Sequence, residues 1–188
     1  MKHVTFINLN QEKKQQYSFD RLGKYIVFFK NLSGKFIFEL KEKGIELDIY
    51  GLFIGKKNDI FKIETIQSHV APGSTSNLLI KGVFYDESKF IYQGLIRIEK
   101  KAQKSHAYQK NQNLIMSDKC FVDSRPFLEI LANDVFCTHG STTGKLNSDQ
   151  RYYLETRGLD KKIAENLLID GFIREIPAKI EEYGYNVS

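Results

Sequence analysis

The stretch Asn77-Leu78-Leu79-Ile80-Lys81-Gly82-Val83-Phe84 is followed, after a short polar turn, by Lys89-Phe90-Ile91-Tyr92-Gln93-Gly94-Leu95-Ile96-Arg97-Ile98. Both runs are rich in β-branched and aromatic residues, which favour strands. Asp, Glu and Ser fill the gap between the runs, as is typical of a turn. Runs of the same kind occupy residues 24–30, 35–40, 45–54 and 60–66. The chain is therefore predicted to be mainly β up to about residue 145.

No segment with a helical period interrupts these strands before residue 146. A long series of short strands is typical of a sandwich, a barrel or a β-solenoid. We find no repeat of fixed length, which argues against a solenoid on internal grounds. The periodicity of the sequence alone does not distinguish between the sandwich, the barrel and the solenoid.

Helix signals begin after Leu146. Asn147 or Ser148 can cap a first helix that Gly158 ends. Asp160 can cap a second helix. We therefore divide the chain into a β core, residues 1–146, and a C-terminal helical segment, residues 147–188.

The second predicted helix ends at Gly171, and Pro177 begins a third short helix over residues 178–183. Four apolar residues of the second helix form one stripe: Ile163, Ala164, Leu167 and Leu168. Such a stripe packs either on the core of the same protein or on a partner.

The composition and charge of the chain limit its possible partners and its location. The 188 residues carry a net charge of +5, but residues 147–188 hold six Lys/Arg and eight Asp/Glu. The lysines are scattered and match no nucleic-acid-binding motif, so we do not expect nucleic acid as a partner. No apolar run reaches membrane length, and Met1–Asn8 alternates like a strand rather than a signal peptide. We expect an intracellular protein, cytoplasmic or in a plastid-type organelle.

One strand carries candidate ligands. Asp134-Val135-Phe136-Cys137 reads as a strand, and Cys137 and His139 lie two residues apart. Alternate residues of a strand share a face, so the thiol and the imidazole are expected to point the same way. Both are ligands for zinc or iron, but two ligands do not complete a site. The remaining ligands would come from elsewhere, including another chain.

The surroundings of this pair resemble the SufB/SufD family, the scaffold proteins of the SUF iron–sulfur cluster assembly machinery. The resemblance covers roughly residues 60 to 175. It rests on several separate motifs: Lys81-Gly82-Val83, Gly94-Leu95-Ile96, Ala102-Gln103-Lys104, Asn113-Leu114-Ile115-Met116-Ser117, Leu128-Glu129-Ile130, Cys137-Thr138-His139-Gly140, and Gln150 to Gly158.

The resemblance is closer to SufD, because Ile130 and Gly140 stand where SufB-like chains carry Cys and Glu. It implies a right-handed parallel β-helix with a C-terminal helical segment. SufD-like proteins also have a helical N-terminal region and a longer β-helix, whereas this chain starts almost directly in strand. The chain is therefore expected to be a reduced homologue or a fragment.

The resemblance also implies partners and a role. A SufB-like subunit would pair edge to edge near residues 127–143 and supply the missing thiol, and a homodimer could substitute in isolation. A SufC-like ATPase would dock on the C-terminal helices. His139, with Cys137 and Glu129 nearby, would contribute to a transient iron–sulfur cluster at the interface. We expect no cluster on the isolated chain.

Two other functions stay open. The first is a β-solenoid used only for protein contacts, with no metal role, in which His139, Cys137 and Glu129 are structural. The second is a barrel-type metal enzyme built on His69, His106 and His139. The chain has no P-loop, G-x-S-x-G, H-E-x-x-H or C-x-x-C motif. We therefore do not expect an enzyme.

Overall fold

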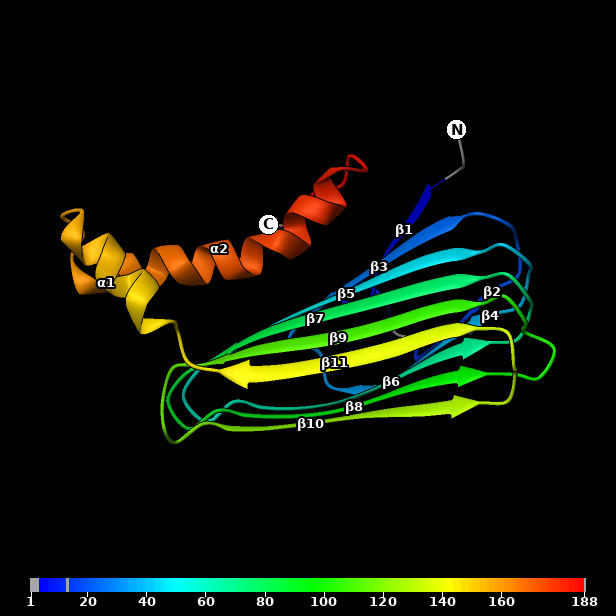
Figure 1. Cartoon of the computed structure of the whole chain (residues 1–188), viewed down its shortest axis with the longest axis horizontal. Helices are drawn as coiled ribbons and strands as arrows, with labels where there is room; N and C mark the ends of the chain where they lie inside the picture. The colour runs from blue at the N-terminus through cyan, green and yellow to red at the C-terminus, as the bar shows by residue number, and fades with distance from the viewer. Residues whose placement is uncertain (1–3, 13, 188) are drawn as a thin grey trace.

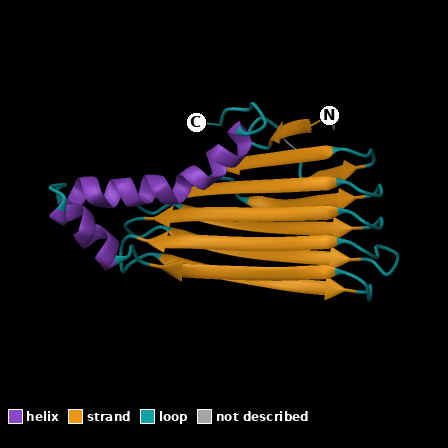
Figure 2. Cartoon of the chain, turned by 45° about the horizontal axis from the view of Figure 1, so that its top comes forward, coloured by secondary structure: helices purple, strands orange, loops and turns teal. Residues whose placement is uncertain are grey.

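The computed structural model describes residues 4–12 and 14–187, so Met1–His3 of the predicted first strand lie outside it. Eleven strands of the described residues form two sheets, and every pair is parallel (Figures 1 and 2). The first sheet has the order β1 (Val4–Asn8), β3 (Lys24–Lys30), β5 (Glu46–Gly55), β7 (Thr75–Phe84), β9 (His106–Ile115) and β11 (Phe136–Gly144). The second has the order β10 (Phe121–Ile130), β8 (Lys89–Ile98), β6 (Ile60–His69), β4 (Gly34–Leu40) and β2 (Gln16–Phe19).

Successive strands of the chain alternate between the two sheets, so the chain winds as a parallel β-solenoid. The predicted β-helix is confirmed, and the sandwich and barrel alternatives are wrong. The missing repeat has a simple cause, which is that the turns differ in length. Val4 pairs with Lys24, Glu46 pairs with Thr75, and Thr75 pairs with His106, so the first turn is markedly shorter than the later ones. No single period therefore fits the sequence.

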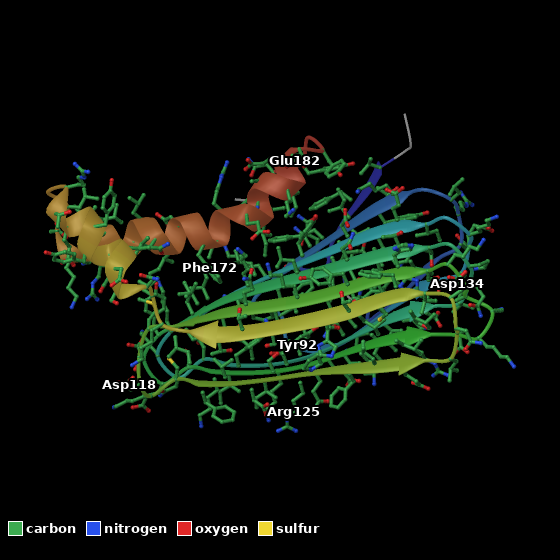
Figure 3. The ribbon with its side chains drawn as sticks, in the orientation of Figure 1. Tyr92, Asp118, Arg125, Asp134, Phe172 and Glu182 are labelled. Atoms are coloured by element: carbon green, nitrogen blue, oxygen red, sulfur yellow. The ribbon has the colours of Figure 1, made fainter. Side chains whose placement is uncertain are left out.

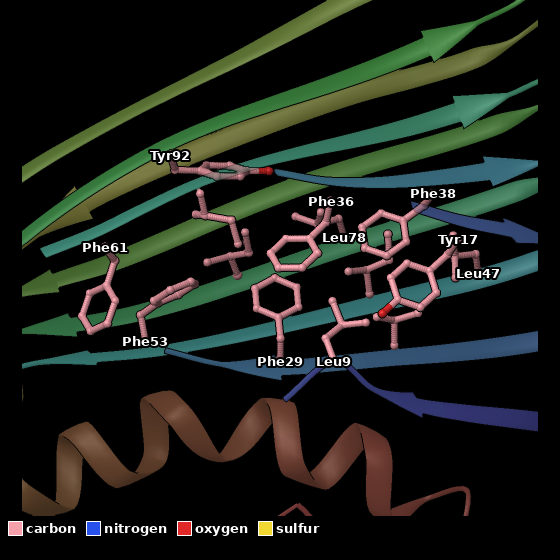
Figure 4. Packing of buried hydrophobic residues seen from close by; sticks show 14 of the residues in the cluster. Leu9, Tyr17, Phe29, Phe36, Phe38, Leu47, Phe53, Phe61, Leu78 and Tyr92 are labelled. Atoms are coloured by element: carbon pink, nitrogen blue, oxygen red, sulfur yellow. The ribbon is translucent and has the colours of Figure 1, made fainter. Parts of the chain in front are cut away.

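Aromatic side chains fill the space between the sheets in the earlier turns (Figure 4). Phe53 contacts three other rings, with ring centroids 6.0 Å from Phe29, 5.4 Å from Phe61 and 4.8 Å from Phe90. Each fully buried side chain of this size stabilises the fold by roughly 1.5–3 kcal/mol. These rings belong to runs that the sequence identified as strands.

The interior becomes polar towards the last turns. The inward residues of β9 are Ala107, Gln109, Asn111 and Asn113, all buried. The two asparagines bond each other, Asn113 Nδ2 donating to Asn111 Oδ1 at 2.7 Å. This polar inner face explains why residues 106–115 lack the apolar alternation of a strand, and why β9 was absent from the predicted strands.

In the described residues, two helices follow the strands. α1 (Ser148–Thr156) is capped by Asn147, whose side chain accepts from the amides of Asp149 and Gln150 at 2.9 and 3.0 Å. α2 (Lys161–Glu181) is capped by Asp160, which accepts from the Ile163 amide at 2.9 Å. Both predicted caps are confirmed.

The predicted stop at Gly171 and the separate helix after Pro177 are wrong, because α2 runs unbroken through both residues. A proline inside a helix costs about 3 kcal/mol. Ile176 and Ile180, on either side of Pro177, are fully buried. Their packing against the first sheet offsets that cost.

The outer face of the first sheet carries α2. Ile176 and Ile180 pack on Ile26 and Phe28 of β3 and on the neighbouring strands β5 and β7. Lys81 of β7, only 5% exposed, anchors the helix: its ammonium lies 2.5 Å from the Glu175 carboxylate and donates to the Phe172 carbonyl at 2.8 Å. Figure 3 shows Phe172 on the side of α2 that faces the strands.

The start of α2 and all of α1 project beyond the ends of the strands (Figure 1). Of the predicted stripe, Ala164 is fully buried, but Ile163 and Leu167 are 51% and 52% exposed. The stripe is therefore only partly covered by the chain itself. No helix of the described residues is long and apolar enough to cross a membrane.

Candidate functional site

The solenoid has an open end at its last turn. Among the residues that the structure describes, β11 pairs only with β9 and β10 pairs only with β8, so each is the terminal strand of its sheet. A terminal strand leaves the backbone N–H and C=O groups of one side without a strand partner. In Figure 1, β11 is the lowest strand of the first sheet and β10 is the lowest strand of the second. The residues singled out by the sequence lie on these two strands.

Cys137 and His139 share one face of β11, as predicted, and the structure shows that this is the inner face. Cys137 pairs in register with Ala107 and packs against the apolar cluster of Ile96, Ile98, Ala102, Ala107 and Ala132. His139 lies two residues further and pairs in register with the inward Gln109. His139 is nevertheless exposed, because β11 is the last strand of the first sheet in the described part of the chain.

The Cys137 thiol is half-buried, and burial raises its pKa. Desolvation penalises the thiolate, which is the form that binds metal. In this chain alone the thiol is therefore kept protonated at neutral pH. A cationic or metal partner would have to supply the charge that stabilises the thiolate.

Glu129 does not join the pair. Val122 of β10 packs into the core, so the residues at odd positions of that strand point outward. Glu129 is accordingly exposed, and its carboxylate lies 3.9 Å from Arg97 Nε of the adjacent strand β8. The structure places Glu129 at the same open end, but on the outer face of the second sheet, whereas Cys137 and His139 lie on the inner face of the first.

Four polar side chains that the sequence did not single out as site candidates complete the inner surface of the open end. The Ser141 hydroxyl donates to the Ser124 hydroxyl at 3.0 Å, which links β11 to β10 across the interior. Asn113 Nδ2 donates to the Thr143 hydroxyl at 3.3 Å. The alternation Gln109-x-Asn111-x-Asn113 was the available signal, because polar residues at every second position mark a shared face.

The remaining histidines lie apart from His139. His69 is fully buried, and both ring nitrogens are bonded, Nδ1 lying 2.7 Å from Ser74 Oγ and Nε2 lying 2.7 Å from Ser76 Oγ. His106 points outward, its ring centroid 6.0 Å from that of Phe136. Among the described residues, no three His, Cys, Asp or Glu side chains are grouped to hold a metal ion. The three-histidine enzyme is therefore wrong.

The fold and this end define a class: a parallel β-solenoid with a helix on one outer face and, at its end, two terminal strands that each have one open edge. The chain matches the family described as "SUF system FeS cluster assembly, SufBD core domain" over residues 30–172. It belongs to the SufB/SufD family and is SufD-like.

Proteins that resemble this chain in sequence support the same family assignment. The chain is 31% identical to the iron-sulfur cluster assembly protein SufD of Escherichia coli (strain K12) over 146 residues, which is 78% of this chain and 34% of that protein. It is 34% identical to SufD of Bacillus subtilis (strain 168) over 122 residues, 65% of this chain and 28% of that protein. Protein ABCI7, chloroplastic, of Arabidopsis thaliana is 25% identical over 184 residues, 94% of this chain and 37% of that protein. The chain spans about a third of the length of these relatives.

Proposed function

We propose that this chain is a SufD-like scaffold subunit in iron–sulfur cluster assembly. The observation that carries the proposal is the open end, where one thiol and one imidazole share the inner face of the terminal strand β11. An iron–sulfur cluster takes four ligands, usually thiolates. Cys137 and His139 provide at most two, so the set is complete only with a second chain.

A SufB-like subunit is the proposed second chain. It would pair its own terminal strands with β10 and β11, which have 10 and 9 residues. Natural proteins seldom leave edges of this length bare, and a stable pairing should bury on the order of 1,000 Å² or more in total. The partner would supply the missing thiol and cover His139. In isolation a homodimer could form through the same strands.

The C-terminal helices are the proposed dock for a SufC-like ATPase. α1 and the start of α2 lie beyond the strands and expose four large apolar side chains: Tyr152, Tyr153, Ile163 and Leu167, each more than half exposed. An apolar group of this kind away from the core is typical of a contact surface. The ATPase would bring the nucleotide chemistry, so this chain would act without being an enzyme itself.

The test is cluster assembly by the complex of this chain with its SufB-like and SufC-like partners. His139→Ala should abolish assembly while leaving the complex intact, and Cys137→Ala should do less harm because its thiol is protonated and partly packed. His106→Ala is the matched control, since His106 lies on the adjacent strand but points outward. The isolated chain should be colourless and bind iron weakly.

The alternative, a solenoid that serves only protein contacts, has one supporting observation, the raised pKa of the Cys137 thiol. It predicts that His139→Ala assembles clusters as well as the wild type does. That outcome would refute the scaffold role of this end. The remaining function would be that of a surface for protein contacts.

A further inference from the structure

We propose that Gln109 positions the His139 imidazole by accepting a hydrogen bond from one ring nitrogen, which leaves the other nitrogen free at the open end. Gln109 is a positioning residue in this proposal, because it acts through His139. The inference rests on the proposed function, since the free nitrogen is the atom that would meet a cluster.

Gln109 holds a buried acceptor without a donor. The residue is 1% exposed, and its Oε1 has no hydrogen-bond partner among the described residues. Its Nε2 donates only weakly, to the Gly94 carbonyl at 3.4 Å. Leaving a buried acceptor unsatisfied costs about 1–3 kcal/mol, so a nearby donor is strongly favoured.

Position 94 fixes where the amide group lies. A Cβ at Gly94 would overlap both Gln109 Nε2 and the Tyr92 hydroxyl oxygen. The Gln109 amide therefore occupies the space over β8 that the missing side chain leaves. Its Nε2 is directed to β8, and its Oε1 is left for a donor from another strand.

His139 is the available donor. It lies in register with Gln109 on the adjacent strand and on the same face, and parallel neighbours are about 4.8 Å apart. The other inward polar residues of β11 have partners in the chain: Ser141 bonds Ser124, and Thr143 accepts from Asn113. In the described part of the chain no hydrogen bond involves the His139 ring. The acceptor and the donor that lack partners are thus neighbours.

The consequence is a fixed tautomer. A neutral imidazole has one N–H donor and one lone pair, and a neighbouring amide oxygen selects which nitrogen carries the hydrogen. Water competes for the exposed ring of the isolated chain. A partner strand over the open end would remove this water and strengthen the bond to Gln109.

The experiment measures the tautomer ratio of His139 in the ¹⁵N-labelled full chain, from two-bond ¹H–¹⁵N correlations of the ring at a pH where the ring is neutral. The wild type should show one dominant tautomer. Gln109→Met has a similar shape but no acceptor, and should change the ratio roughly three- to tenfold, the range for one hydrogen bond. Gln109→Asn, an amide like its neighbours Asn111 and Asn113, withdraws the acceptor by one methylene group and should give the same change.

The matched control is Gln67→Met. Gln67 is also fully buried with an unpartnered Oε1, but it lies on β6, away from β11. This variant should leave the His139 ratio unchanged. A wild-type ratio in both Gln109 variants, or an equal change in the Gln67 variant, would overturn the positioning role.

The two proposals fail in different ways. If His139→Ala abolishes cluster assembly but the Gln109 variants keep the wild-type tautomer ratio, the scaffold role stands and the positioning role is refuted. If the ratio responds to Gln109 but His139→Ala assembles clusters normally, the hydrogen bond is real and the scaffold role of His139 is refuted.

Discussion

Acidification should destabilise this protein in a window set by the buried imidazole of His69. The ring is fully buried, and burial lowers its pKa from 6.5 to about 4. Ser74 and Ser76 bond its two nitrogens, and both hydroxyls can adapt to a neutral ring. A protonated ring would place an unpaired charge in the interior.

The sign and size of the change in the free energy of unfolding follow from proton linkage. Between pH 6.5 and pH 4 the unfolded chain binds a proton at His69 that the folded chain does not, so the free energy of unfolding falls as the pH falls. These two pKa values give a loss of about 2 kcal/mol between pH 7.5 and pH 5, which approaches its limit below pH 4. Most carboxylates titrate below pH 5, which keeps this window nearly free of them.

Urea unfolding of the wild type and of His69→Gln at pH 7.5 and pH 5 measures the effect. Glutamine can bond both serines but does not titrate, so the variant should lose about 2 kcal/mol less than the wild type over this interval. His106→Gln, at an exposed position, should lose as much as the wild type does. Equal losses in the wild type and in His69→Gln would refute the assignment to His69.

Two further predictions concern α2. Gly171→Ala should raise the free energy of unfolding by about 0.5–1 kcal/mol, because the position is helical and an added Cβ meets no atom within 4 Å; a lower urea midpoint would contradict this. Lys81→Met should lower the free energy of unfolding by about 1–3 kcal/mol through loss of the bonds to Glu175 and Phe172, and should speed amide exchange in α2 more than in the strands. Exchange that is unchanged in α2 would show that Lys81 does not anchor the helix.

The sequence alone predicted several local features: two strands, two helix caps and one shared strand face. Residues 24–30 and 89–98 were predicted as strands with the bounds that the structure has, because their apolar side chains fit a pleated core. Asn147 and Asp160 were predicted as caps because a short polar side chain satisfies free amides wherever a helix begins. The shared face of Cys137 and His139 followed from strand alternation.

Long-range packing decided the rest. In β9 the alternation of Gln109, Asn111 and Asn113 indicates a shared face, but only the stacked turns bury that face and let the two asparagines bond each other. α2 passes through Gly171 and Pro177 because the first sheet buries its isoleucines, which no local propensity records. Glu129 lies between two apolar residues, Leu128 and Ile130, and it faces outward beside Arg97.

The sequence by itself determined that the chain is a series of strands followed by helices, with a thiol and an imidazole on one strand, because these properties depend on close neighbours along the chain. The tertiary structure alone decided that this strand is the last of its sheet and that His139 lies beside Gln109, a full turn of the solenoid earlier in the chain. The stacking of turns of unequal length determines which residues become neighbours in space. The spacing of residues along the sequence does not indicate this stacking.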